Sequence, residues 1–509
     1  MKPKTRRWLA IALGCLIALI LVIVVTLKFY SPLTKNWVTK TLERRYASKV
    51  DIGDFQASVF PPSAVAENLV FRLHGRTDVP PFVTIKKLTI QAGFLGLLRS
   101  PRQVSQVRLE GLTIQIPPRE REHKQPETRK QQKDEEDHTA FVINELIADG
   151  TQLKILPRDT GKEPKHFDIS RLTMRSVGKD RPMTFVSTLT NAKPPGEIHS
   201  SGEFGPWHKE EPGETPVSGK YTFRNAKLDV FKGIGGTLSS DGQYKGTLDR
   251  IEVDGTTDTP DFQVTQSGNR VDLKTQFHSI VDGTDGDTLL QPVKASFLHS
   301  VVVAEGGVEG KPGVKGKTVT LNVHVGNSRV DDLLRLAIKG KPPMTGSIGF
   351  DAKLIIPPGP QDVIDKLQLY GDFGIGSAKF ANLDVEHKIT LLSQRSRGHT
   401  DDDPTESVWS NLKGHFNLKN GVVNFSRLSF GVPGAEIQLE GSYRIHSEEL
   451  NFEGTARLQA KPSEMTTGYK SVLLKVIDPF FRKNGATVIP IKITGTKSHP
   501  SFGLAWKKR

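Results

Sequence analysis

The feature that most constrains this chain is an uncharged apolar run near its start. Residues 8–27 (WLAIALGCLIALILVIVVTL) follow the basic segment MKPKTRR. About 20 apolar residues let an α-helix cross a bilayer core of roughly 30 Å, and basic residues favour the cytoplasmic side. We therefore expect a single-pass anchor with a cytoplasmic N-terminus and with residues 28–509 outside the cytoplasm. Its apolar side chains include Trp8, Leu9, Ile11, Leu16, Leu21 and Leu27.

A cleaved signal peptide is the alternative interpretation of this run. Secretory peptides have an apolar region of about 7–15 residues followed by a small-residue cleavage site. This run is longer, and it continues into LKFYSP without such a site. The pattern favours an uncleaved anchor.

Composition indicates a folded exported body with a basic surface. Hydrophobic residues make up 36% of the chain and glycines number 47, which argues against a disordered tail. The only cysteine, Cys15, lies in the apolar run, so the exported part forms no disulfides. A net charge of +14 favours contact with anionic lipid headgroups over contact with nucleic acid in an exported protein. A merely soluble basic surface remains the alternative.

Most of the chain alternates apolar and polar residues with the period of a β-strand. Residues 83–91 (VTIKKLTIQ) and 107–116 (VRLEGLTIQI) each contain one slip in this alternation, at Lys86-Lys87 and at Gly111. A slip in a period of two is typical of a β-bulge, which bends a sheet. Short strands separated by Gly, Pro, Asn and Asp predict a mostly antiparallel β protein.

Four segments have helical spacing, and one segment has no apolar face. The helical segments are 33–47, 330–338, 361–369 and the stronger 470–481, whose apolar face includes Val472, Leu473, Val476 and Phe480. The first is expected to lie beside the membrane or to be the first core helix. The last is expected to plug the end of the sheet as ordinary core or to gate a groove or dock on a membrane or partner. Residues 117–139 are highly charged and are expected to form a disordered loop.

No motif in the sequence points to catalysis, a metal or a cofactor. GIGG at 233–236 lacks the lysine and the following helix of a phosphate loop, so we expect a turn. DGTDGDT at 282–288 lacks the spacing and distal glutamate of a calcium loop. The sequence contains no G-x-S-x-G, and its histidines are scattered singly. We expect a non-enzymatic protein.

Two stretches resemble the AsmA-like proteins of Gram-negative envelopes, a family related to TamB and to the chorein-type bridge-like lipid carriers. The first comprises DIGDFQASVFPPSAVAENLVFRL (51–73) and VTIKKLTIQAGFLGLLRSPRQVSQVRLEGLTIQIPP (83–118). The second comprises GVVNFSRLSFGVPGAEIQLEGSYRIHSEELNFEGTARL (421–458) and GATVIPIKITGTKSHPSFGL (485–504). Residues 191–207 and 248–262 are similar to a subtype of the same family.

The resemblance implies an inner-membrane anchor followed by a long curved antiparallel sheet, the "β-taco", with an apolar groove for acyl chains. It also implies a periplasmic body that takes part in phospholipid transport or outer-membrane biogenesis. The expected domains are a basic tip (1–7), the anchor (8–27), an N-terminal chorein-like region (28–116), the charged loop (117–139), a central groove region (140–400) and an AsmA-like C-terminal region (401–509).

Reasoning from the residues alone supports a groove, because an open sheet with one apolar face needs a second layer or a greasy ligand to cover it. Candidate groove residues are the apolar members of the alternating sets: Val83, Ile85, Val107, Leu109, Ile114, Val319, Leu321, Val323, Phe425, Phe430, Leu439, Phe452, Ile489 and Ile491. Two compact β-sandwiches are the alternative fold. A structural or assembly factor that tethers envelope partners is the alternative function.

Overall fold

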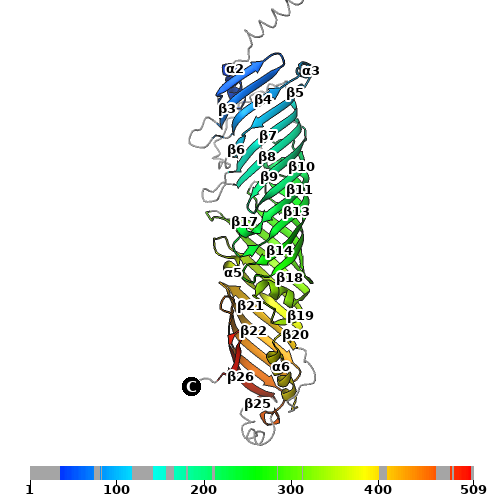
Figure 1. Cartoon of the computed structure of the whole chain (residues 1–509), viewed down its shortest axis with the longest axis vertical. Helices are drawn as coiled ribbons and strands as arrows, with labels where there is room; N and C mark the ends of the chain where they lie inside the picture. Colours follow the sequence, from blue (N-terminus) through cyan, green and yellow to red (C-terminus); the bar gives the residue numbers. More distant parts are fainter. Residues whose placement is uncertain are drawn as a thin grey trace, which may run out of the picture. The chain divides into compact units, whose positions relative to one another are not determined.

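The computed structural model describes residues 35–46, 48–73, 81, 83–116, 141–155, 165–178, 181–208, 212–283, 285–311, 313–399, 410–465, 482–483 and 486–505. These residues form a mostly β protein with 27 strands and a few short helices (Figure 1). Three expectations, the anchor at 8–27, the loop at 117–139 and the helix at 470–481, fall outside the described residues. Among the described helices, none combines the length and apolarity needed to span a bilayer.

The chain divides into two compact units. Unit 1 comprises Met1–Ala192, Glu197–Thr222 and Tyr244–Arg250, and unit 2 comprises Lys193–Gly196, Phe223–Gln243 and Ile251–Arg509. The described residues begin with α2 (Lys35–Tyr46), β1 (Ser48–Asp51), β2 (Asp54–Ser58), β3 (Ser63–Leu73), β4 (Val83–Gln91), α3 (Phe94–Leu97), β5 (Arg102–Glu110), β6 (Thr113–Ile116), β7 (Phe141–Ile155), β8 (Lys165–Val177), β9 (Met183–Ala192), β10 (Pro195–Phe204), η1 (Pro212–Glu214) and β11 (Pro216–Lys227).

The chain continues with η2 (Leu228–Val230), β12 (Ile234–Gly235), β13 (Thr237–Thr247), β14 (Arg250–Val264), β15 (Arg270–Val281), β16 (Thr288–Phe297), β17 (Ser300–Gly310), β18 (Lys317–Arg329), α4 (Val330–Ala337), β19 (Met344–Ile356), α5 (Val363–Lys366), β20 (Gln368–Phe380), α6 (Leu383–Ser396), β21 (Ser410–Lys419), β22 (Val422–Val432), β23 (Ala435–Arg444), β24 (Glu449–Leu458), η3 (Pro462–Met465), β25 (Arg482–Lys483), β26 (Ala486–Thr496) and β27 (Pro500–Leu504).

Unit 1 is built on a mixed sheet in which β3 pairs with β1, β2 and β4, and β7 pairs with β8. Nearly all pairs are antiparallel, as the sequence predicted, but β7 runs parallel to β5 and β6. Parallel neighbours require a crossover of a dozen or more residues, and residues 117–140 between β6 and β7 supply that length.

The two slips in the alternation are real irregularities, although they are not bulges with an extra residue. Between the register pairs Thr84↔Thr113 and Lys87↔Glu110, each side has two residues. Gly111 interrupts its strand with a φ of +63°, which favours glycine. Val83 and Leu88 lie on either side of the slip and pack against the same buried cluster, so the apolar face of β4 continues past the slip.

Unit 2 is built on an antiparallel sheet whose strands pair in chain order from β14 to β24, followed by β26 and β27. Register shifts recur along it, for example between Val325 and Ser328 and between Ile375 and Ala378. Such bulges bend a sheet. Because each unit's strands follow one ladder, the alternative of two compact sandwiches does not describe them.

Helix predictions met mixed outcomes. The predicted helices at 33–47 and 330–338 are confirmed as α2 and α4. The predicted helix at 361–369 is confirmed only for Val363–Lys366, which form α5, and β20 begins at Gln368. Leu369 belongs to the alternation that continues through Phe373 and Ile375, so strand pairing overrides the local helical spacing.

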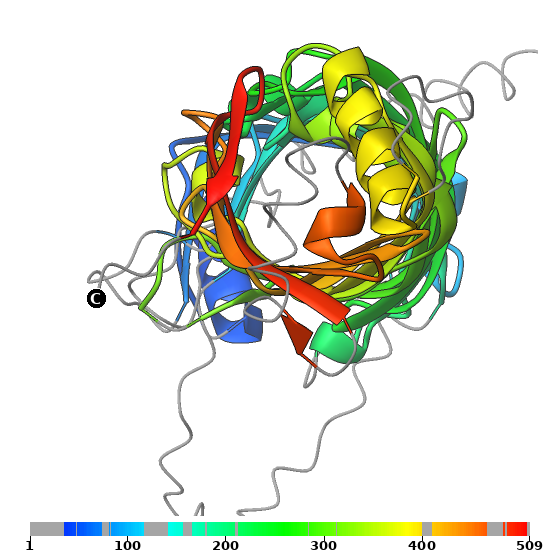
Figure 2. The same ribbon diagram turned by 90° about the horizontal axis from the view of Figure 1, so that it is seen from below.

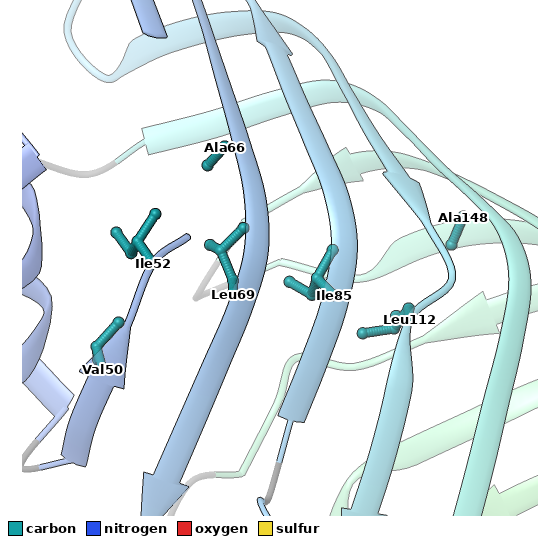
Figure 3. Close-up of a cluster of buried hydrophobic side chains, with 7 residues drawn as sticks. All are labelled: Val50, Ile52, Ala66, Leu69, Ile85, Leu112 and Ala148. Carbon is teal, nitrogen blue, oxygen red and sulfur yellow. The ribbon is translucent and has the colours of Figure 1, made fainter. Parts of the chain in front are cut away.

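Three buried clusters lie where helices pack on the sheets. In unit 1, Val38 and Leu42 of α2 pack against a cluster that includes Val50, Leu69 and Ile85, whose side chains project to one side of the strands (Figure 3). This packing favours the core-helix interpretation of α2. In unit 2, α4 packs against Ile348, Ile375 and Ala378, and α6 packs against Phe430, Val432, Ala435, Ala456 and Leu458.

Candidate functional site: an apolar sheet face

The register of unit 2 places apolar side chains on one face of successive strands. Leu321 of β18 lies opposite Leu354 of β19, which lies opposite Leu369 of β20. The line continues through β21 to β24, and all its members share a face because directly opposite residues of paired strands do so. We call this line the apolar row: Leu321, Leu354, Leu369, Leu418, Val423, Tyr443 and Leu450.

The structure places the candidate groove residues on two faces, one in each unit. In unit 1, Val83 lies opposite Ile114, and Ile90 lies opposite Val107. Ile85 and Leu109 share that face and contribute to the cluster under α2. In unit 2, the face of the apolar row also carries Val319, Leu321, Val323, Phe425, Phe430, Leu439, Phe452, Ile489 and Ile491.

An aromatic cluster adjoins the apolar row. The ring of Phe373 lies 6.0 Å from Phe416 and 6.1 Å from Phe425, and Phe425 lies 5.7 Å from Phe452. Edge-to-face and tilted contacts at this spacing stabilise aromatic pairs. Sequence reasoning identified Phe425 and Phe452 but missed Phe373 and Phe416. Glycines at same-face positions, such as Gly371 beside Phe373, conceal the apolar alternation around both residues.

Cover over this face is uneven. Ile389 and Leu392 of α6 and Met465 of η3 pack on the part that carries Phe430 and Leu458, and Figure 2 shows both helices inside the curve of the strands. The apolar face of unit 2 is therefore its concave face. Leu321, Leu354, Leu369 and Val423 lie outside the three buried clusters and remain half-buried.

Half-buried apolar side chains on a concave sheet suit a flexible hydrocarbon guest. Each CH₂ group moved out of water contributes about 0.8 kcal/mol, without a requirement for a specific polar contact. Successive rows of side chains across the strands present similar aliphatic and aromatic surface, so a hydrocarbon chain meets similar contacts at each row. Such a surface suits acyl chains better than a ligand that needs fixed hydrogen bonds.

The opposite face of unit 2 is polar. His324 Nδ1 lies 2.6 Å from Asp351 Oδ1, and His415 Nδ1 lies 3.1 Å from Asp372 Oδ1, both across paired strands. A depression of about 680 Å³ on this face is lined by charges of both signs that include Lys413, Arg427 and Glu440. It opens widely to solvent, so we place the candidate site on the concave face and not there.

Two motifs singled out in the sequence, the glycine-rich 233–236 and the acidic 282–288, take part in turns and strand contacts within the described residues. At 233–236 the expected turn is confirmed only at Gly233, with a φ of +94°, because Ile234 and Gly235 form β12 opposite Val264 and Gln263. In the turn at 282–288, Asp287 Oδ1 accepts hydrogen bonds from Lys317 Nζ at 2.6 Å and from the Gly310 amide at 2.9 Å. Over the described ranges, no group of three or more His, Cys, Asp or Glu side chains forms a candidate metal site.

The hydroxyl group of Tyr443 is partly shielded from water within the apolar row. Its side chain belongs to the concave face, between Val423 and Leu450. Burial raises the pKa of Tyr443 from 10.0 to about 12, and the nearby carboxylate of Glu448 acts in the same direction. Both effects disfavour the phenolate.

This shift predicts a loss of stability in alkali. Because the folded state holds the Tyr443 proton more tightly than the unfolded chain, its contribution is complete below pH 10 and is lost as the pH rises toward 12. We expect Tyr443→Phe to remove this part of the decline. Urea unfolding of both proteins at several pH values in that window measures it, and parallel declines would contradict the assignment.

The chain was compared with protein-family models and with curated proteins, and neither comparison found a match.

Proposed function

We propose that the concave face of unit 2 binds phospholipid acyl chains, and that the protein is an inner-membrane-anchored periplasmic protein of a Gram-negative envelope. In this proposal the protein takes part in lipid transport or outer-membrane biogenesis. The observation that carries it is the apolar row, in which Leu321, Leu354 and Leu369 stay half-buried near the aromatic cluster. The resemblance to AsmA-like proteins and the apolar run at 8–27 supply the membrane setting.

Movement of lipid along such a face needs no energy source within the protein. Neighbouring rows present similar hydrocarbon contacts, so a bound chain exchanges one row for the next at little net cost in free energy. A charged headgroup stays in water, where it keeps its hydration. Net flow then follows the difference in lipid supply between the two ends of the path.

Site-specific photo-crosslinking in living cells tests this proposal with a matched control. A photoreactive amino acid replaces Leu354 on the concave face or its neighbour Lys353, which is exposed on the polar face. We expect phospholipid adducts, identified by mass spectrometry, from position 354 and not from 353. Protein adducts without lipid at 354 favour the alternative of a tethering or assembly factor, and equal lipid labelling at both positions contradicts a lipid-binding face.

A further inference from the structure

A compact set of apolar side chains projects from unit 1 into solvent. Phe60 in the β2–β3 turn is 79% exposed, and Phe94, Leu95 and Leu98 in and after α3 are 47%, 77% and 82% exposed. The rings of Phe60 and Phe94 lie 5.6 Å apart, so the two loops form one surface. We call these four residues the tip patch. Clustered exposure of this kind marks an interaction site, unlike scattered single residues.

The loops that carry the tip patch are fixed to the sheet. The Ala92 amide donates to the Pro62 carbonyl at 3.0 Å, which ties one loop to the other. At Gly96 the helix α3 lies so close to β5 that a Cβ would approach the Gln103 carbonyl to 2.7 Å. No side chain of α3 is buried. The patch is thus held in place while its apolar groups face water.

Charge around the tip patch is basic. The segments 58–63 and 92–107 contain Arg99 and Arg102 and no acidic residue. Arg99 and Arg102 are both exposed, and Arg99 Nη1 donates to Gln103 Oε1 at 3.1 Å beside Leu98. Protruding apolar side chains with two arginines beside them match the chemistry of a bilayer with anionic headgroups.

The tip patch also lies at the end of unit 1 that carries α2, the first helix of the described residues (Figure 1). Lys35, the first residue of α2, donates from Nζ to the Gly53 carbonyl at 2.9 Å. From there β2 spans five residues, roughly 17 Å, to the turn that carries Phe60. Figure 1 shows α2 and α3 at the same end of unit 1. The apolar run at 8–27 precedes α2 in the sequence.

We propose that the tip patch inserts into the interfacial layer of an anionic phospholipid bilayer and gives unit 1 a membrane contact besides the apolar run. Phe60, Phe94, Leu95 and Leu98 enter the layer between headgroups and acyl chains. Arg99 contacts lipid phosphate. This contact sets how unit 1 stands on the membrane and does not depend on acyl chains binding to unit 2.

The test uses the full chain reconstituted in vesicles, with a fluorophore at one position. In a Cys15→Ser background, Leu95→Cys carries an environment-sensitive label, and Val186→Cys is the matched control, since Val186 is an apolar residue of unit 1 that is 61% exposed. In vesicles of phosphatidylcholine and phosphatidylglycerol, we expect the label at 95 to be quenched severalfold more by spin-labelled acyl chains than the label at 186. Arg99→Glu should weaken the contact about fivefold or more.

Three results would overturn the proposal. In the first, the water-soluble quencher quenches both labels equally and the lipid-borne quencher quenches neither. Another is insensitivity to the fraction of phosphatidylglycerol and to Arg99→Glu. The third is an apolar signal at position 95 that rises with protein density and ignores the lipid-borne quencher, which would assign the patch to a second copy of the chain.

Discussion

Gly454→Ala is expected to lower the free energy of unfolding of unit 2 by about 3 kcal/mol, the upper range for overpacking a closely packed site. Gly454 lies in β24 opposite Leu439 and Ile491. A Cβ at this position would overlap the Gln438 carbonyl oxygen of β23, which is backbone and yields only if the strand moves. The strand movement would also disturb the register that builds the concave face.

Gly431→Ala is the matched control in the same unit. A Cβ at Gly431 meets nothing within 4 Å. Alanine there should therefore change the free energy of unfolding by less than about 1 kcal/mol, and any gain would come from the lower conformational entropy of the unfolded chain. Urea unfolding together with hydrogen exchange of β23 and β24 measures both variants. Equal, small effects would show that the close approach of the two strands at Gly454 does not constrain the fold.

Other glycines on the apolar face explain why part of the site escaped prediction from the sequence. Strand alternation follows from a period of two, so the face of Val319, Leu321 and Val323 was predictable without coordinates. Gly371 and Gly414 occupy apolar-face positions without an apolar side chain, and the alternation around Phe373 and Phe416 is therefore incomplete. The aromatic ring of Phe373 lies over Gly414, where a Cβ would meet its Cε1 atom at 3.2 Å.

Register is the other quantity that the sequence does not determine. The apolar row requires that Leu321 face Leu354 and that Leu354 face Leu369, and a shift of one residue in any strand would break it. Bulges alter the register between segments, and their positions depend on the pairing of two strands rather than on one strand's pattern.

Helix α6 was not predicted, although its helical spacing is visible in the sequence. Val385, Ile389 and Leu392 follow the i, i+4, i+7 spacing, and Asn382 Oδ1 accepts a hydrogen bond from the Val385 amide at the helix start. At 361–369 a similar spacing misled, since Val363 and Leu367 fit one face of a helix while Leu367 and Leu369 fit one face of a strand. Length separates the two cases, because α6 continues for 14 residues and α5 for four.

Leu321→Asp is expected to reduce lipid crosslinking from position 354 by at least about tenfold while leaving unit 2 folded. Leu321 faces Leu354 across the strand pair, so a carboxylate there contacts any acyl chain that touches Leu354. The change removes the contribution of one apolar side chain, about 1.5–3 kcal/mol, and the desolvation of a charge adds to the loss. Because Leu321 is only half-buried, the carboxylate keeps water in the lipid-free protein, and the fold tolerates it.

Asn322→Asp is the control that separates this effect from charge alone. It adds the same charge one residue along β18, on the exposed polar face opposite Lys353. We expect normal crosslinking and normal unfolding for Asn322→Asp, and normal unfolding with little crosslinking for Leu321→Asp. If Leu321→Asp is folded and its lipid adducts at 354 are undiminished, the chains do not lie along the apolar row. If instead both variants lose crosslinking equally, the loss follows net charge, and the hydrocarbon contact at Leu321 is not its cause.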